Sequence, residues 1–192
     1  MIVVGVDPGK WGAIAVIAPT VDAPLLYPMP VIRSTNGRDE YNEAEIARLL
    51  GGALAGQKGV TVFLEKGQPL PPKMGGTVAN FQRGYARGLF VGILTALRIP
   101  YELVAPRVWQ REMHGGTSGD DLKQRSIIAA QRLFPGVSLL RTVLSRKPDD
   151  GLAEALLIAE WGRRKLAGWI EEAGVTLDFS RESLGGIGKG RE

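Results

Sequence analysis

The sequence predicts an α/β protein, built on a five-stranded mixed sheet that is flanked by helices on both faces. Two runs, residues 2–6 and 59–64, are almost wholly apolar and rich in β-branched side chains, which is typical of buried parallel strands. Three strand-like segments come first, and helical and strand-like segments alternate after them, which predicts helices on both faces of one sheet. With 192 residues, 44% of them apolar, the chain is long enough to bury a substantial core.

The N-terminal segment is expected to form a strand meander. Residues 2–6 form the first strand, a glycine-containing turn follows, and residues 13–18 form a second strand that folds back. Residues 24–28 are bounded by prolines, which indicates a short edge strand. Residues 32–39 are polar and contain a glycine, so we expect a loop there.

Helices and strands alternate in the rest of the chain. The first helix is expected over residues 41–50, with Asn42 as its N-cap and Gly51 at its stop. The other expected elements are the strands 59–64 and 100–104 and the helices 77–97, 106–113, 119–134 and 148–166. This is the element order of the ribonuclease H-like fold. We therefore expect one domain of that fold over residues 1–166 and a peripheral, glycine-rich tail over residues 167–192.

The composition excludes cysteine-based chemistry and gives no sign of a membrane span or a signal peptide. The chain has no cysteine, which excludes disulfides, thiolate nucleophiles and cysteine zinc sites. No apolar run approaches the length of a membrane span, and no basic segment precedes the first strand as it does in a signal peptide. We therefore expect a cytoplasmic protein.

Positive charge is concentrated in the middle of the chain. The net charge is +4, but residues 66–147 hold 13 basic and 4 acidic side chains, a local balance of +9. The remaining residues hold 11 basic and 16 acidic side chains, or −5. Such a basic block favours a surface for a polyanion. The alternative is a set of solvated helix faces, and charge alone does not decide between the two.

Two of the apolar strands end in a carboxylate. Asp7 follows the first strand, and Glu65 follows the strand over residues 59–64. A buried acid is costly unless it is paired or binds a cation. If the two strands are parallel neighbours, both acids lie at the carboxyl edge of the sheet, where open α/β sheets bind ligands. An Asp-Pro-Gly sequence is equally typical of a turn, so Asp7 alone leaves both interpretations open.

The last helix supplies a second pair of acids. Asp150 and Glu154 are four residues apart and therefore share one helix face. An ordinary acidic helix start explains Asp149 and Asp150 but not Glu154, which stands among alanines and leucines. Four carboxylates at one strand edge repel one another unless cations lie between them. Oxygen ligands favour magnesium or manganese, and two such ions about 3.5–4 Å apart suit phosphodiester displacement.

Four segments together resemble the RuvC-type Holliday-junction resolvases, and most of all the phage members of that family. The segments are residues 4–9, 63–65, 120–123 and 150–159, and the likeness covers residues 1–164 in the same order. The resemblance implies a homodimeric, magnesium-dependent crossover junction endodeoxyribonuclease with two ions per active site, for which manganese substitutes. It also implies a set of metal ligands, Asp7, Glu65, Asp150 and Glu154.

Two further positions follow from the resemblance. Family members often space the last two acids three residues apart, which leaves Asp149 as an alternative ligand; the shared helix face favours Asp150. Lys123 stands where the family has a catalytic lysine. A cation there neutralises the phosphate or positions the attacking water.

The DNA-contacting residues that the resemblance implies are mostly basic. The family carries an aromatic wedge in the loop after the second acid, but residues 66–76 contain no aromatic, so Leu70 or Met74 is the expected apolar substitute. Phe81 and Tyr85 come later, on the next helix, and belong either to the DNA surface or to the core. The full set of expected DNA-binding residues is Lys66, Lys73, Met74, Phe81, Arg83, Arg87, Arg111, Arg146 and Lys147.

Three glycines, Gly84, Gly88 and Gly92, recur every four residues in the helix 77–97. Each glycine inside a helix costs about 1 kcal/mol relative to alanine, so three on one face need a reason. Close approach to a second copy of the chain is the interpretation that we prefer, and packing on the parent sheet is the alternative.

These observations predict a structure-selective endonuclease that binds four-way DNA junctions as a dimer. It is expected to cut two strands of like polarity, leaving a 5′ phosphate and a 3′ hydroxyl, in the bacterial host cytoplasm if phage-encoded. Two other functions stay open. A non-catalytic junction- or RNA-binding relative usually lacks one of the acids, whereas all four positions are acidic here. An actin-like ATPase needs a second lobe, for which 192 residues leave little room.

Overall fold

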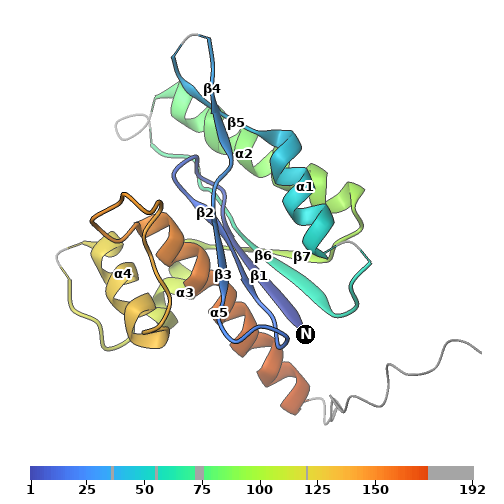
Figure 1. Cartoon of the computed structure of the whole chain (residues 1–192), viewed down its shortest axis with the longest axis vertical. Coiled ribbons are helices and arrows are strands. Elements are labelled where there is room, and N and C mark those ends of the chain that lie inside the picture. Colours follow the sequence, from blue (N-terminus) through green and yellow to red (C-terminus); the bar gives the residue numbers. More distant parts are fainter. Residues whose placement is uncertain (36, 55, 72–75, 120, 173–192) are drawn as a thin grey trace, which may run out of the picture.

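The computed structural model describes residues 1–35, 37–54, 56–71, 76–119 and 121–172. Its centre is a five-stranded sheet (Figure 1). The strand order is β3 (Leu25–Pro28), β2 (Ala13–Ile17), β1 (Ile2–Asp7), β6 (Val60–Glu65) and β7 (Tyr101–Val104). Strand β1 pairs with β6 in parallel and with β2 antiparallel, and β6 pairs with β7 in parallel. The predicted five-stranded mixed sheet is therefore confirmed.

Helices cover both faces of the sheet, as predicted (Figure 1). One face carries α1 (Glu43–Leu54) and α2 (Thr77–Ala96), and the other carries α3 (Pro106–Met113), α4 (Leu122–Leu133) and α5 (Asp150–Glu172). The side chains of β1 alternate between these layers. Val4 and Val6 join a core with Ile46 of α1 and Phe90 of α2, whereas Val3 joins the core of α3, α4 and α5. The buried apolar strands thus hold two helical layers together.

Glycine at residue 5 brings α5 against the middle of the sheet. A Cβ atom at Gly5 would lie 2.2 Å from the carbonyl oxygen of Ala155 and 2.3 Å from the nitrogen of Ala159. Gly162 makes a second close approach, because a Cβ atom there would lie 2.1 Å from the ring of Phe63. The start of α5 is held near the end of β1 by this packing, which decides where its acidic side chains lie.

Two predicted boundaries near the first helix are wrong. Residues 31–33 and 39–41 form a hairpin, β4 (Val31–Arg33) and β5 (Asp39–Tyr41), where a loop was expected. The hairpin is anchored, since the hydroxyl of Tyr41 donates to the carbonyl of Pro8 at 2.8 Å. Helix α1 also continues past Gly51 to Leu54. The burial of Leu54 offsets the roughly 1 kcal/mol that a glycine costs inside a helix.

The helix caps agree better with the sequence. The side chain of Asn42 accepts from the backbone of Glu45 at 3.2 Å, which confirms the predicted cap of α1. Helix α4 begins later than expected, at Leu122, because Asp121 caps it. Helix α5 continues to Glu172 instead of ending near residue 166, and the rest of the predicted tail, residues 173–192, lies outside the described residues.

The three glycines of α2 do not pack on the sheet. The sheet-facing side of α2 consists of Ala86, Phe90 and Leu94. A Cβ atom at Gly84, Gly88 or Gly92 would meet nothing within 4 Å. The alternative that these glycines serve the parent sheet is therefore wrong, and they form an open strip on the outer side of the helix. None of the helices in the described part of the chain combines the length and apolar character of a membrane span.

Candidate active site

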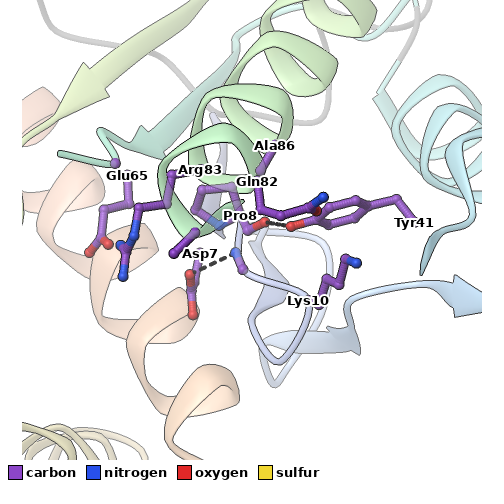
Figure 2. Close-up of a pocket in the computed structure, with 11 residues that line it drawn as sticks. Asp7, Pro8, Lys10, Tyr41, Glu65, Gln82, Arg83 and Ala86 are labelled. Carbon is purple, nitrogen blue, oxygen red and sulfur yellow. Dashed lines mark hydrogen bonds between the residues drawn. The ribbon is translucent and has the colours of Figure 1, made fainter. Parts of the chain in front are cut away.

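Two carboxylates lie side by side at one edge of the sheet. Asp7 is the last residue of β1 and Glu65 the last residue of β6. The strands are parallel neighbours in register, with Val6 opposite Leu64, so both acids emerge at the carboxyl edge. Figure 2 shows them on adjacent strands, facing the same hollow. This is the arrangement that the two strand ends predict.

The first turn of α5 closes the site from the other side of the sheet. A Cβ atom at Gly151 would lie 2.1 Å from the carbonyl oxygen of Trp11, so only a glycine lets α5 begin this close to the turn after β1. Asp150 and Glu154, at the start of that helix, then face the strand edge. The charges of Asp7, Glu65 and Asp150 all act on Glu154, so the four acids lie near one another at this edge.

Electrostatic repulsion is strong at this edge. Burial first, and then the charges of Asp7, Glu65 and Asp150, raise the pKa of Glu154 to about 8. Burial and the charge of Asp7 likewise raise the pKa of Glu65 to about 7. Burial raises the pKa of Asp7 as well, although the N–H of Gly9 opposes the rise by donating to its Oδ1 at 3.1 Å. Such a cluster is favourable in its charged form only when cations compensate it.

The neighbouring acids Asp149 and Asp150 have different surroundings. Asp149 accepts from the backbone of Leu152 at 2.9 Å, as a helix cap, and pairs with Arg141 at 2.6 Å. Asp150 pairs instead with Lys123, whose Nζ lies 2.6 Å from its Oδ2. Since the side chain of Asp149 is already engaged by the cap and by a guanidinium, the geometry favours Asp150 as the ligand.

Two side chains that sequence reasoning missed orient the glutamates. Trp109, fully buried on α3, donates from Nε1 to Oε2 of Glu65 at 2.9 Å. Ser126, fully buried on α4, lies with its Oγ 3.3 Å from Oε1 of Glu154 and 3.0 Å from Nε2 of His114. No local pattern marks these partners. A serine among buried apolar positions of α4 was the one available signal.

The donor set fits divalent metal ions. All four side chains offer oxygen atoms, which magnesium and manganese prefer. Within the described residues, no three acidic or histidine side chains lie close enough together to bind a metal ion without rearrangement. Burial and mutual repulsion raise the pKa values of Glu65 and Glu154, and a bound cation would relieve that repulsion. We therefore regard these four residues as the candidate ligands.

A hollow beside the carboxylates extends toward α2 and the hairpin (Figure 2). Arg83 lines it, and the charge of Arg83 lowers the pKa of Glu65. Phe81 is 66% exposed, so this side chain does not belong to the core. Leu70 is less suited to a wedge, because its side chain is only partly exposed, while its backbone is fixed by two hydrogen bonds to the side chain of Asn80, at 2.8 and 3.0 Å. Residues 72–75, which include the expected DNA contacts Lys73 and Met74, lie outside the described residues.

The other expected DNA-binding residues lie at the surface, on several elements. Arg111 lines a second hollow together with Arg107 and Arg125. Lys66 is exposed directly after Glu65. The remaining members lie on α2, which carries the half-buried Arg87, and in the segment before α5, which carries the exposed Arg146 and Lys147.

The strand order and the two helical layers define a ribonuclease H-like fold. The structure is similar to Thermus thermophilus RuvC in complex with a Holliday junction substrate, with a TM-score of 0.55 and 15% identity over 88% of this chain and 96% of that one. A second Thermus thermophilus RuvC structure gives a TM-score of 0.52 and 16% identity over 91% of this chain and 97% of that one. These similarities confirm the predicted fold.

A sequence relative points the same way. The chain is 31% identical over 108 residues to the chloroplastic Holliday junction resolvase MOC1 of Chlamydomonas reinhardtii. That match covers 54% of this chain but only 12% of the length of the relative. No family model matches the chain. The predicted resemblance to RuvC-type resolvases is thus confirmed in sequence and in fold.

The repulsion at the acidic edge predicts a pH-dependent stability. In metal-free buffer, the folded state binds more protons than the unfolded state between the ordinary glutamate pKa, 4.5, and the raised values of about 7 for Glu65 and about 8 for Glu154. The free energy of unfolding should therefore fall as the pH rises through that window. Thermal unfolding in EDTA at several pH values measures this effect. Glu154→Gln should flatten the profile, and an unaltered slope in that variant would contradict the assignment.

The Trp109 contact makes a second prediction. Trp109→Phe removes the hydrogen bond that lowers the pKa of Glu65, so the acid limb of the cleavage pH profile should move to higher pH. The metal concentration needed for half-maximal cleavage should rise by about tenfold, as for other residues that orient a ligand. Trp161→Phe is the matched control, because it removes the same volume from a buried ring that contacts Phe63 instead. Identical pH profiles for the two variants would show that Trp109 only fills space.

Proposed function

We propose that this chain is a metal-dependent endonuclease that resolves four-way DNA junctions. One observation carries the proposal: carboxylates from two adjacent strand ends and one helix meet at a single edge of a ribonuclease H-like sheet. The similarity to RuvC and MOC1 supports the junction as substrate, because that RuvC structure is a complex with a Holliday junction substrate and MOC1 is named a Holliday junction resolvase. We further propose that the nuclease domain covers residues 1–166, as the sequence predicts. Cytoplasmic location and phage origin are likewise predictions.

The residues have separate roles in this proposal. Asp7 acts electrostatically on both Glu65 and Glu154, so its carboxylate would be a ligand common to the site that these acids form. Asp7, Glu65, Asp150 and Glu154 would hold magnesium or manganese ions, and such ions would supply an activated water and stabilise the charge on the leaving 3′ oxygen. Lys123 lies at the rim, 70% exposed and paired with Asp150, where its ammonium group reaches a phosphate or orients the water. The products then carry a 5′ phosphate and a 3′ hydroxyl.

Paired cleavage requires two active sites, which a homodimer supplies. The outer strip of α2, Gly84, Gly88 and Gly92, is exposed and leaves room for close approach of a second helix. Seven of the nine expected DNA contacts are basic, so junction binding should weaken steeply with salt. These contacts are Lys66, Lys73, Met74, Phe81, Arg83, Arg87, Arg111, Arg146 and Lys147.

The test is cleavage of a synthetic four-way junction. With magnesium, the chain should introduce paired nicks in strands of like polarity, and a linear duplex of the same arm sequences should stay intact. Replacing magnesium by EDTA should abolish cutting. Tight junction binding without cleavage in magnesium or manganese would instead identify a non-catalytic junction binder. ATP turnover without DNA would contradict the proposal in favour of an ATPase.

A further inference from the structure

We propose that residues 140–147, here called the apolar loop, insert two apolar side chains, Val143 and Leu144, between DNA bases. The insertion takes place at the branch point, next to the cut strand. The inference rests on the proposed function and adds a part to it. Val143 is 99% exposed and Leu144 is 86% exposed, the highest values among the large hydrophobic side chains of the described residues. Exposed apolar side chains of this kind mark a contact surface.

The tip of the apolar loop is a closed turn that presents this pair. The backbone N–H of Ser145 donates to the carbonyl of Thr142 at 3.0 Å, across Val143 and Leu144. The hydroxyl of Ser145 also accepts from the backbone N–H of Thr142 at 3.1 Å, and the two hydroxyls lie 3.0 Å apart. The local polar groups are thus satisfied within the turn, and the two apolar side chains project without any packing of their own.

The base of the apolar loop is fixed to the active-site edge. Arg141 pairs with Asp149 at the start of α5, and its Nη2 donates to the carbonyls of Gly12, at 3.0 Å, and of Trp11. The backbone of Asp149 also bonds to the carbonyl of Leu139 at 2.8 Å, which closes the loop. Figure 1 shows this segment in orange, joining α4 to the start of α5. A wedge anchored there acts within reach of the carboxylates.

The surroundings of the tip identify nucleic acid as the partner. Arg146 and Lys147 follow the apolar pair and are exposed, and residues 136–147 contain no acid. Trp11, 72% exposed and in contact with the guanidinium of Arg141, adds an aromatic face at the base of the loop. Apolar side chains flanked by cations are the means by which proteins unstack base pairs while holding phosphates. An apolar protein partner does not account for the cations.

The experiment follows base unstacking directly. A four-way junction with 2-aminopurine at the branch point is bound by the full chain in calcium, so that fluorescence reports unstacking without cleavage. The fluorescence rise should be at least about fivefold smaller for the double variant Val143→Ser/Leu144→Ser than for the unaltered chain. Val21→Ser/Leu25→Ser is the matched control. These two apolar side chains are also exposed, but they lie after β2, whereas the apolar loop is anchored to the residues before β2. This control should give the full fluorescence rise.

Cleavage in magnesium then separates a wedge from other roles. Mismatched bases at the branch point should narrow the difference in cutting rate between the loop variant and the unaltered chain. Equal fluorescence and equal cutting of the paired junction by the loop variant would overturn the inference. Loss of dimerisation by the loop variant in sedimentation would also overturn the inference, because it would assign Val143 and Leu144 to an interface between two copies of the chain. The binding curve of the unaltered chain tests the proposed function separately. If the unaltered chain does not bind the junction, the proposed function is wrong, whatever the loop variant does.

Discussion

Asp7→Asn is expected to lower junction cleavage by at least about 10³-fold, because it removes the carboxylate suited to be shared between two ions. The charge of Asp7 raises the pKa of both Glu65 and Glu154, so its carboxylate acts on both glutamates of the cluster. The amide has nearly the same shape, so binding of the junction should be retained or become tighter. In EDTA the variant should also unfold at a higher temperature, since one repelling charge is gone.

Asp22→Asn is the control for this variant. Asp22 is exposed between β2 and β3, at the opposite edge of the sheet from Asp7. The substitution Asp22→Asn makes the same chemical change far from the candidate active site, so the rate of cleavage should be unaffected. Normal cutting by Asp7→Asn, measured as initial rates on the same junction, would contradict the metal-ligand assignment.

Gly5→Ala is expected to destabilise the fold by about 3 kcal/mol or more. The added methyl group would lie 2.2 Å from the Ala155 carbonyl and 2.3 Å from the Ala159 nitrogen. Both contacts are with helix backbone, which cannot rotate away as a side chain does. Strand β1 and helix α5 must therefore separate, and Asp150 and Glu154 must move with the helix. Urea unfolding measures the loss of stability.

Gly52→Ala is the matched control for the strand glycine. Gly52 is an exposed residue of α1, and a Cβ atom there meets nothing within 4 Å. Its replacement should stabilise the chain by up to about 1 kcal/mol, because alanine is the better helix former. If both variants shift the urea midpoint in the same direction, the close packing of α5 on β1 is not what limits stability.

Much of the site was visible in the sequence because its signals are local. A carboxylate at the end of an apolar strand is unusual, and both Asp7 and Glu65 show that pattern. Glu154 was conspicuous because it stands among alanines and leucines on an otherwise apolar helix. The i, i+4 spacing also placed Asp150 on the same face. Each of these inferences needs only strand or helix periodicity.

The contacts that orient the acids were not visible, because they join distant segments. The hydrogen bond between Trp109 and Glu65 spans 44 residues, and that between Arg141 and the carbonyl of Gly12 spans 129. Neither residue stands in a pattern that predicts its partner. The β4–β5 hairpin was missed for a different reason, since strands of three residues are too short for an alternating pattern to stand out.

The apolar loop illustrates the same limit. Residues 140–147 belong to the basic block of residues 66–147, but two apolar residues within such a block carry no local sign of exposure. Only the turn between Thr142 and Ser145, and the anchoring of Arg141, show that Val143 and Leu144 project.

A crystal structure of the full chain grown with manganese tests the central claim most directly. The account predicts anomalous density enclosed by the carboxylates of Asp7, Glu65, Asp150 and Glu154, with Asp149 still paired to Arg141. Manganese bound by Asp149, or bound only at sites away from the ends of β1 and β6, would contradict it.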